Sequence, residues 1–351
     1  MVKYRDKILN ILRWALGALF IFSGAVKCVD PIGTSIFVDK YLTTYSMEAL
    51  VPLSVAIGLA LSVMEFMLGT LLICGLWRRF LSLVSVVVLV LFSVVTLLSA
   101  TLLPIGDCGC FGEVLKLSPW ATFLKNIILL AIALYVWRNS RNEWRLGLRE
   151  VIVLAFAILV PLGANLYALS HLPLVDSLPY KVGTNLREAV AKEQDSVRSV
   201  LRFRNSATGD IEEFDAMATE CWMRRDLEFL ESAVVVDDKA EYSDFRLYDT
   251  AGEEYTQKLL NRRGRVALLC INDISALDIL TQKAIETLCN AYPETAIYIL
   301  SYTEVEDHIL PLNATHLYID AMTLRSIIRA DIGVVILRDG VVEFKANIKD
   351  I

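Results

Sequence analysis

The sequence contains little charge, few histidines and none of the common catalytic motifs. Of its 351 residues, 21% are charged, 55% are hydrophobic and only three are histidine. A chain this apolar is not one water-soluble globule. It has no glycine-rich phosphate loop, H-E-x-x-H motif or nucleophile elbow, which argues against the nucleotide-binding, zinc-protease and serine-hydrolase classes.

The chain also lacks a strongly basic region. Residues 1–171 carry 14 Lys and Arg against 9 Asp and Glu, whereas residues 172–351 carry 20 against 31. Because binding to nucleic-acid phosphates needs concentrated positive charge, a nucleic-acid partner is disfavoured. The contrast indicates an apolar, mildly basic half followed by an acidic, soluble half.

Long apolar runs fill the first half. A bilayer core is crossed by about 20 helical residues, and a span in lipid must satisfy its own backbone hydrogen bonds. We therefore predict a polytopic α-helical membrane bundle of five spans in contact with lipid, the first retained as an anchor rather than cleaved as a signal peptide. The five runs are 8–26, 51–76, 80–103, 120–137 and 151–169.

The distribution of positive charge predicts the orientation of these spans. Ten Lys and Arg residues fall before or near the start of the first run, between the second and third, or between the fourth and fifth, whereas four fall on the opposite side. The positive-inside rule then predicts a cytoplasmic N-terminus and an extracytoplasmic segment 172–351.

Two ionisable residues lie inside the predicted spans, Arg13 in the first and Glu65 in the second. At a rise of ~1.5 Å per residue, both lie roughly 8–15 Å from the cytoplasmic boundary. Since intramembrane charges are costly unless paired, we predict an Arg13–Glu65 pair facing the bundle interior. This pair is either a structural clamp between two helices or part of a proton relay.

The loop between the third and fourth spans contains the sequence Cys108-Gly109-Cys110. Glycine lets the chain bend so that the two sulfurs meet, and a disulfide closed over one residue is strained and readily reduced. Cys28, at the outer end of the first span, would be a third thiol that resolves or relays the pair. Three interpretations stay open: a redox-active pair, a structural disulfide, or a soft-metal site completed by Cys28 or His171.

Several segments in residues 1–140 together carry a family resemblance. They are 17–27 (GALFIFSGAVK), Asp30-Pro31, Tyr41, Glu65 with Leu68-Gly69, and 107–112 (DCGCFG). With them, this region resembles the MauE branch of the DoxX-like membrane proteins. The resemblance implies a four-helix module in the bacterial inner membrane. It also implies a thiol-linked role, because MauE is thought to assist disulfide maturation of methylamine dehydrogenase during methylamine utilisation.

The last third of the chain has the element order of a thioredoxin fold. Apolar strands are predicted at 265–271 and 295–301 around a helix at 276–291, and a helix at 323–329 precedes a hairpin of 333–337 with 341–345. Where such proteins carry C-x-x-C, this chain has Asn272-Asp273-Ile274-Ser275, and the usual cis-proline loop reads Asp331-Ile332-Gly333. We predict an α/β thioredoxin-like extracytoplasmic domain without a redox centre of its own.

Four parts of the chain follow from these patterns. They are a four-helix DoxX/MauE-like domain (1–140), a fifth transmembrane helix (141–172), a linker with mixed α/β structure (173–241) and the degenerate thioredoxin-like domain (242–351). In the third part we expect a hairpin of 201–205 with 211–214, a helix at 221–230 and a strand at 233–236. A further strand is expected at 245–248, and Cys270 is expected to fill the core.

Two functions are compatible with the sequence. In the first, the protein is an inner-membrane thiol–disulfide helper in which Cys108 and Cys110 exchange electrons with a periplasmic client or a partner oxidoreductase, held by the thioredoxin-like domain. No residue identifies a cofactor, although other four-helix thiol oxidases suggest a quinone by analogy. In the second, it is a non-enzymatic assembly protein, and Cys108-Gly109-Cys110 is a structural disulfide.

Overall fold

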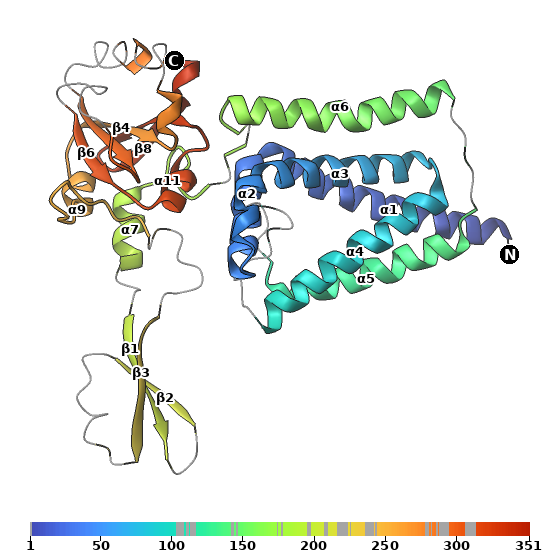
Figure 1. Cartoon of the computed structure of the whole chain (residues 1–351), viewed down its shortest axis with the longest axis horizontal. Helices are drawn as coiled ribbons and strands as arrows, with labels where there is room; N and C mark the ends of the chain where they lie inside the picture. The colour runs from blue at the N-terminus through green and yellow to red at the C-terminus, as the bar shows by residue number, and fades with distance from the viewer. Residues whose placement is uncertain are drawn as a thin grey trace. The chain divides into compact units, whose positions relative to one another are not determined.

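The computed structural model describes most of the chain. The described residues are 2–102, 109, 112, 117–141, 144, 147–173, 175–176, 178–194, 198–206, 210–215, 224, 226–235, 242, 244–277, 281, 283–285, 287, 295–305 and 314–351. They fall into two compact units, Met1–Leu178 and Pro179–Ile351. In Figure 1 the colour runs from blue to green through the first unit and from green to red through the second.

Among its described residues, the first unit contains five helices that are long and apolar enough to cross a membrane. The five predicted spans are thereby confirmed as helices. Their shared core is rich in leucine, with Leu16, Leu68, Leu72, Leu89 and Leu129 all buried. The helices are α1 (Val2–Val29), α3 (Ser54–Cys74), α4 (Arg78–Thr101), α5 (Pro119–Asn139) and α6 (Leu148–Ser170).

Two shorter helices lie between α1 and α3 in the chain, namely α2 (Pro31–Thr44) and the 3-10 helix η1 (Glu48–Leu53). The start of α2 has a local cause, because Asp30 caps it by accepting a 2.7 Å hydrogen bond from the Gly33 amide, and Pro31 occupies its first turn. α2 packs mainly against α3. The periodicity of the sequence did not predict this helix, although Asp30-Pro31 is a helix-start signal.

Glycines allow α1 and α3 to pack backbone against backbone. A Cβ atom on Gly24 would lie 2.5 Å from the Phe66 nitrogen, and one on Gly69 would lie 2.5 Å from the Gly17 carbonyl oxygen. Small residues permit this approach in membranes, where van der Waals packing drives helix association. The same contacts set the antiparallel register of the two helices and hence decide which polar side chains meet.

The described part of the second unit forms two sheets. In the larger one, of order β6-β5-β4-β7-β8, β4 is parallel to β5 and antiparallel to β7, which forms a hairpin with β8. Its strands are β4 (Arg265–Ile271), β5 (Ala296–Ser301), β6 (Thr315–Tyr318), β7 (Ile332–Arg338) and β8 (Val341–Asn347). The smaller sheet is antiparallel, of order β2-β1-β3, and consists of β1 (Arg198–Asn205), β2 (Ile211–Asp215) and β3 (Leu227–Val235).

Burial explains why these segments of the larger sheet are strands. Every residue of β4 after Arg265 is buried, which fits its continuous apolar run. The described helices and 3-10 turns of the second unit are α7 (Leu186–Gln194), α9 (Thr256–Leu260), η3 (Ile274–Ala276), α11 (Ala321–Ile327) and η5 (Ile348–Asp350). Four predicted strands of the larger sheet and the β1–β2 hairpin are confirmed. Within the predicted helix 276–291, residues 281, 283–285 and 287 are helical.

Two sequence predictions in this unit were wrong. The helix expected at 221–230 is not formed over its described end: residues 227–230 belong to β3 instead. The reason is that residues 227–235 pair with β1. This pairing places Arg202 opposite Glu231, and the two form a 3.0 Å ion pair. In place of the strand expected at 245–248, Tyr248 forms two isolated bridges, one to Glu254 and one to Tyr318 at the end of β6. There the Phe245 amide bonds to the Tyr242 carbonyl rather than to a neighbouring strand.

Candidate functional site: a polar cavity within the helices

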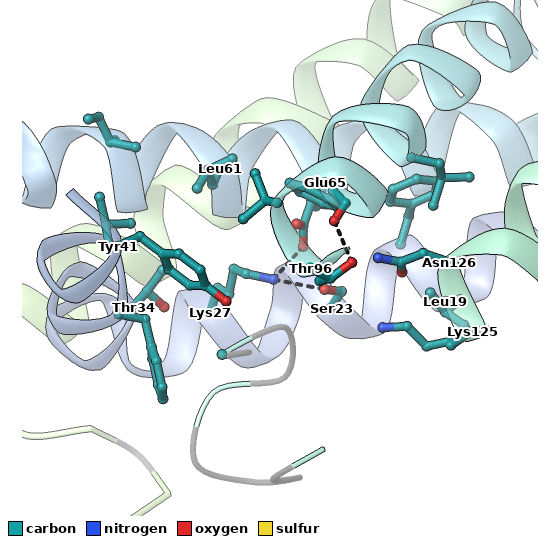
Figure 2. A pocket seen from close by; sticks show the side chains of 18 of the residues that line it. Leu19, Ser23, Lys27, Thr34, Tyr41, Leu61, Glu65, Thr96, Lys125 and Asn126 are labelled. Atoms are coloured by element: carbon teal, nitrogen blue, oxygen red, sulfur yellow. Dashed lines mark hydrogen bonds and ion pairs between the residues drawn. The ribbon is translucent and has the colours of Figure 1, made fainter. Parts of the chain in front are cut away.

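A cavity of about 260 Å³ lies among α1, α2, α3, α4 and α5 (Figure 2). Most of its wall is apolar, with leucine and phenylalanine side chains from several of these helices. The polar side chains that line it are Ser23, Lys27, Thr34, Tyr41, Glu65, Thr96, Lys125 and Asn126. An apolar pocket with a few convergent polar groups is the usual form of a small-molecule site.

The central polar feature of the cavity is an ion pair between α1 and α3. Nζ of Lys27 lies 2.8 Å from Oε2 of Glu65 and donates a second 2.8 Å hydrogen bond to Oγ of Ser23. The two charged side chains are only 7% and 1% exposed. Ser23 and Lys27 share a helix face because they are four residues apart. The close approach of Gly24 to Phe66 brings Glu65 within reach.

The predicted Arg13–Glu65 pair is not formed. Arg13 instead donates a 2.7 Å hydrogen bond to the Leu72 carbonyl and a 3.3 Å bond to Oδ1 of Asn10. Because α1 and α3 run antiparallel, Arg13 lies at the C-terminal end of α3, where a cation suits the free carbonyls and the helix dipole. Lys27, closer to the other end of α1, is the cation that reaches Glu65.

Two atoms in the cavity wall have no hydrogen-bond partner within the described part of the chain. They are Oε1 of Glu65 and Nδ2 of Asn126, and these residues are 1% and 2% exposed. In Figure 2 the Asn126 amide and the Lys125 amine point toward the same space as the Lys27–Glu65 pair. Since buried polar groups are normally bonded, the wall offers one unused acceptor and one unused donor.

Gly109 connects the predicted redox motif to this cavity. It is buried, lines the cavity and has a φ of +64°. A Cβ atom there would lie 2.6 Å from Cγ of Phe37, so both the backbone conformation and the close contact require glycine. The adjacent Cys108 and Cys110 lie outside the described residues. Their redox role stays a prediction.

Cys28 is free of any disulfide and buried. Its sulfur lies 3.6 Å from Nδ2 of Asn165 on α6, which also donates to Oγ of Ser62 at 2.8 Å. The described wall of the cavity contains no cysteine. His171, the other suggested metal ligand, stacks on Tyr167 with 4.5 Å between ring centroids.

The loop after β4, where the sequence predicts a thioredoxin-like domain that lacks its C-x-x-C, contains no cysteine over residues 272–275. After β4, Nδ2 of Asn272 donates to the carbonyls of Ile328 and Ala330, and the Asp273 carboxylate accepts from the amide and hydroxyl of Ser275. The Asn272 bonds tie the loop to the segment after α11, and the Asp273–Ser275 bonds hold the loop's own turn. Cys270 is fully buried, and burial raises the pKa of its thiol to about 12, which fits the predicted core-filling role. Cys221 and Cys289 lie outside the described residues.

Comparison with known proteins identifies the segment that builds the cavity. Residues 5–138 match the family model described as Methylamine utilisation protein MauE. This MauE-matched segment spans the five helices that line the cavity, whereas α6 and the second unit follow it. The family match and the five apolar helices make the chain a multi-pass membrane protein.

A more distant relative covers part of the chain. Over 164 residues the chain is 24% identical to Protein TlpB of Flavobacterium psychrophilum. The aligned stretch covers 44% of this chain and 40% of that protein. The chain therefore spans less than half the length of this relative. No solved structure matches the chain.

Sequence reasoning found Glu65 but missed its partner and two other polar residues of the wall. In the sequence, Lys27 ends the segment 17–27 that carries the family resemblance, and Lys27 and Lys125 are two of the four basic residues on the extracytoplasmic side. Asn126 was not considered. The available signal was that an intramembrane carboxylate needs a cation. Arg13, inside the first predicted span, and Lys27, directly after it, are both candidates. Only the register of α1 against α3 selects between them.

Proposed function

We propose that the protein is a thiol–disulfide helper of the bacterial inner membrane, with Cys108-Gly109-Cys110 as its exchange motif on the periplasmic side. The observation that carries this proposal is the position of Gly109, which is buried in the wall of a polar cavity within the MauE-matched segment. Through its central residue, the motif is attached to a cavity containing a desolvated ion pair. A purely structural disulfide has no need of such a cavity.

The exchange proceeds in two displacement steps through a mixed disulfide. A thiolate of a periplasmic client attacks one sulfur of the Cys108–Cys110 disulfide, which breaks that bond and forms a mixed disulfide. The second client thiolate then displaces this sulfur and closes the client disulfide. The client loses two electrons and two protons, and Cys108 and Cys110 become thiols. Lys27 contributes little positive field to a thiolate here, because Glu65 neutralises it at 2.8 Å.

The second unit serves this function by binding the client or a partner oxidoreductase. Its parallel pair β4–β5 followed by the antiparallel hairpin β7–β8 supports a thioredoxin-like fold. The loop after β4 contains no cysteine and is held by the hydrogen bonds of Asn272. In this proposal the domain recognises extended polypeptide without reacting itself, and the orientation follows the positive-inside rule.

Maleimide mass-tagging of Cys108 and Cys110 in native membranes tests the proposal. We expect a mixed oxidised and reduced population that shifts under mild reductant. In Cys110→Ser or Cys108→Ser the remaining thiolate can attack the disulfide of an oxidised client, which forms a mixed disulfide and releases one client thiolate. Because the second cysteine is absent, we also expect this mixed disulfide to be trapped at normal protein levels. Cys74→Ser is the matched control and should trap no mixed disulfide. It also replaces a thiol by a hydroxyl, but Cys74 is the last residue of α3.

The opposite result would favour a non-enzymatic assembly protein. A pair that is fully oxidised and resists mild reductant, with lower protein levels in both serine variants, would identify a structural disulfide. The hydrogen-bonded loop after β4, which lacks a redox pair, is the observation in favour of this second function.

A further inference from the structure

We infer that the cavity is a binding site for a membrane-soluble quinone, with the ring held between Glu65 and Asn126. This inference rests on the proposed function, for which it supplies the electron acceptor. Both residues are almost fully buried, and both present an atom without a partner in the described part of the chain. One of these atoms is an acceptor, Oε1 of Glu65, and the other is a donor, Nδ2 of Asn126.

The volume of the cavity and the composition of its wall argue against water as the sole occupant. A water molecule occupies about 30 Å³ in the liquid and needs two to four polar partners, whereas this cavity measures about 260 Å³ and is mostly apolar. Large apolar cavities stay dry or bind apolar molecules. The wall therefore fits a molecule with an apolar body and a compact polar head.

The two unused atoms narrow the chemistry of that head. An amide N–H binds a carbonyl oxygen, which is the polar group of an oxidised quinone. A carboxylate oxygen binds a hydroxyl, which replaces that carbonyl in the reduced quinol. Lys27 donates to Glu65 and Ser23 and so orients the carboxylate. A quinone–quinol couple can thus use the donor in one state and the acceptor in the other.

Oxidation of the cysteine pair and reduction of the quinone involve the same number of electrons. The two sites are adjacent, because Gly109 of the Cys108-Gly109-Cys110 motif lines the cavity. When the thiols of Cys108 and Cys110 form a disulfide, they release two electrons and two protons. The quinone takes up both and becomes a quinol, with the two carbonyl oxygens converted to hydroxyls. The S–S bond that forms is the bond that the next client dithiol breaks.

Equilibrium binding to the full chain in lipid nanodiscs tests the site without requiring turnover. The probe is ubiquinone-1, and decylbenzene serves as a competitor without carbonyl groups. We expect saturable binding that Asn126→Leu weakens about fivefold to tenfold, since one buried hydrogen bond is lost. Leu61→Trp, which fills the cavity and leaves its polar groups in place, should weaken it more than tenfold.

Asn165→Leu is the matched control, because Asn165 is also a buried amide with one unpartnered atom but lies on α6, away from the wall. It should leave ubiquinone-1 binding unchanged. Equal competition by decylbenzene would overturn the inference in favour of a lipid chain. Non-saturable binding, or equal binding by wild type and Leu61→Trp, would also overturn it.

The two proposals fail separately. The double variant Cys108→Ser/Cys110→Ser should bind ubiquinone-1 as well as wild type does while losing thiol exchange. Exchange without quinone binding overturns only the cavity assignment. Quinone binding by a chain whose cysteines prove structural overturns only the exchange function.

Discussion

The buried Lys27–Glu65 pair predicts a strong energetic coupling between α1 and α3. The 2.8 Å contact joins side chains that are 7% and 1% exposed, so either charge alone would remain desolvated. Removing one partner of such a pair costs about 3–5 kcal/mol, whereas replacing both is often nearly neutral. We therefore expect Glu65→Gln and Lys27→Met each to lower the free energy of unfolding by about 3–5 kcal/mol. The double variant should lose less than either single variant.

The assay is unfolding of the purified full chain in mixed micelles, analysed as a double-mutant cycle. A parallel cycle with Arg13→Gln and Glu65→Gln is the control, because Arg13 bonds to the Leu72 carbonyl rather than to Glu65. Its two effects should be additive. Additive effects for Lys27 and Glu65, or strong coupling between Arg13 and Glu65, would refute the described register of the two helices.

Three further predictions concern packing, the fifth span and the buried thiol. Gly24→Ala should lower the free energy of unfolding by about 1–3 kcal/mol in the same assay, because the added Cβ would lie 2.5 Å from the Phe66 nitrogen. Gly163→Ala should not lower it, because no atom of another segment lies within 4 Å of the Cβ that it adds. Asn165→Ala should lower the unfolding free energy by about 1–2 kcal/mol, since its bonds to Ser62 and the Pro161 carbonyl are lost; an unchanged value would show that they do not hold α6. Cys270, with a pKa of about 12, should resist maleimide at pH 8 until the chain is denatured, because the thiolate fraction rises only as pH approaches that pKa. Labelling of Cys270 in the native protein, detected by mass spectrometry of its peptide, would contradict this.

Local patterns of the sequence were enough to predict the elements whose environment is uniform. A membrane span must be apolar along its whole length, so five runs predicted five helices. A strand buried on both faces is likewise continuously apolar, as in residues 265–271. A glycine likewise indicates a local bend, and Gly109 has a φ of +64°, which glycine readily adopts.

Long-range pairing, by contrast, was decided only by the tertiary structure. Residues 227–235 form β3 because β1 lies beside them, and no pattern within that segment predicts the partner. The partner of Glu65 followed from the antiparallel register of α1 and α3, which depends on contacts at Gly17, Gly24 and Gly69. Counting residues from the span boundaries gives the depth of a residue in the membrane but not the register between two helices. Depth alone therefore predicted Arg13 as the partner of Glu65. The cavity is the extreme case, since five helices must pack before Asn126 and Glu65 share one wall. Composition and periodicity act within one segment, whereas a site depends on the relative positions of several segments, and those are set by side-chain packing between them.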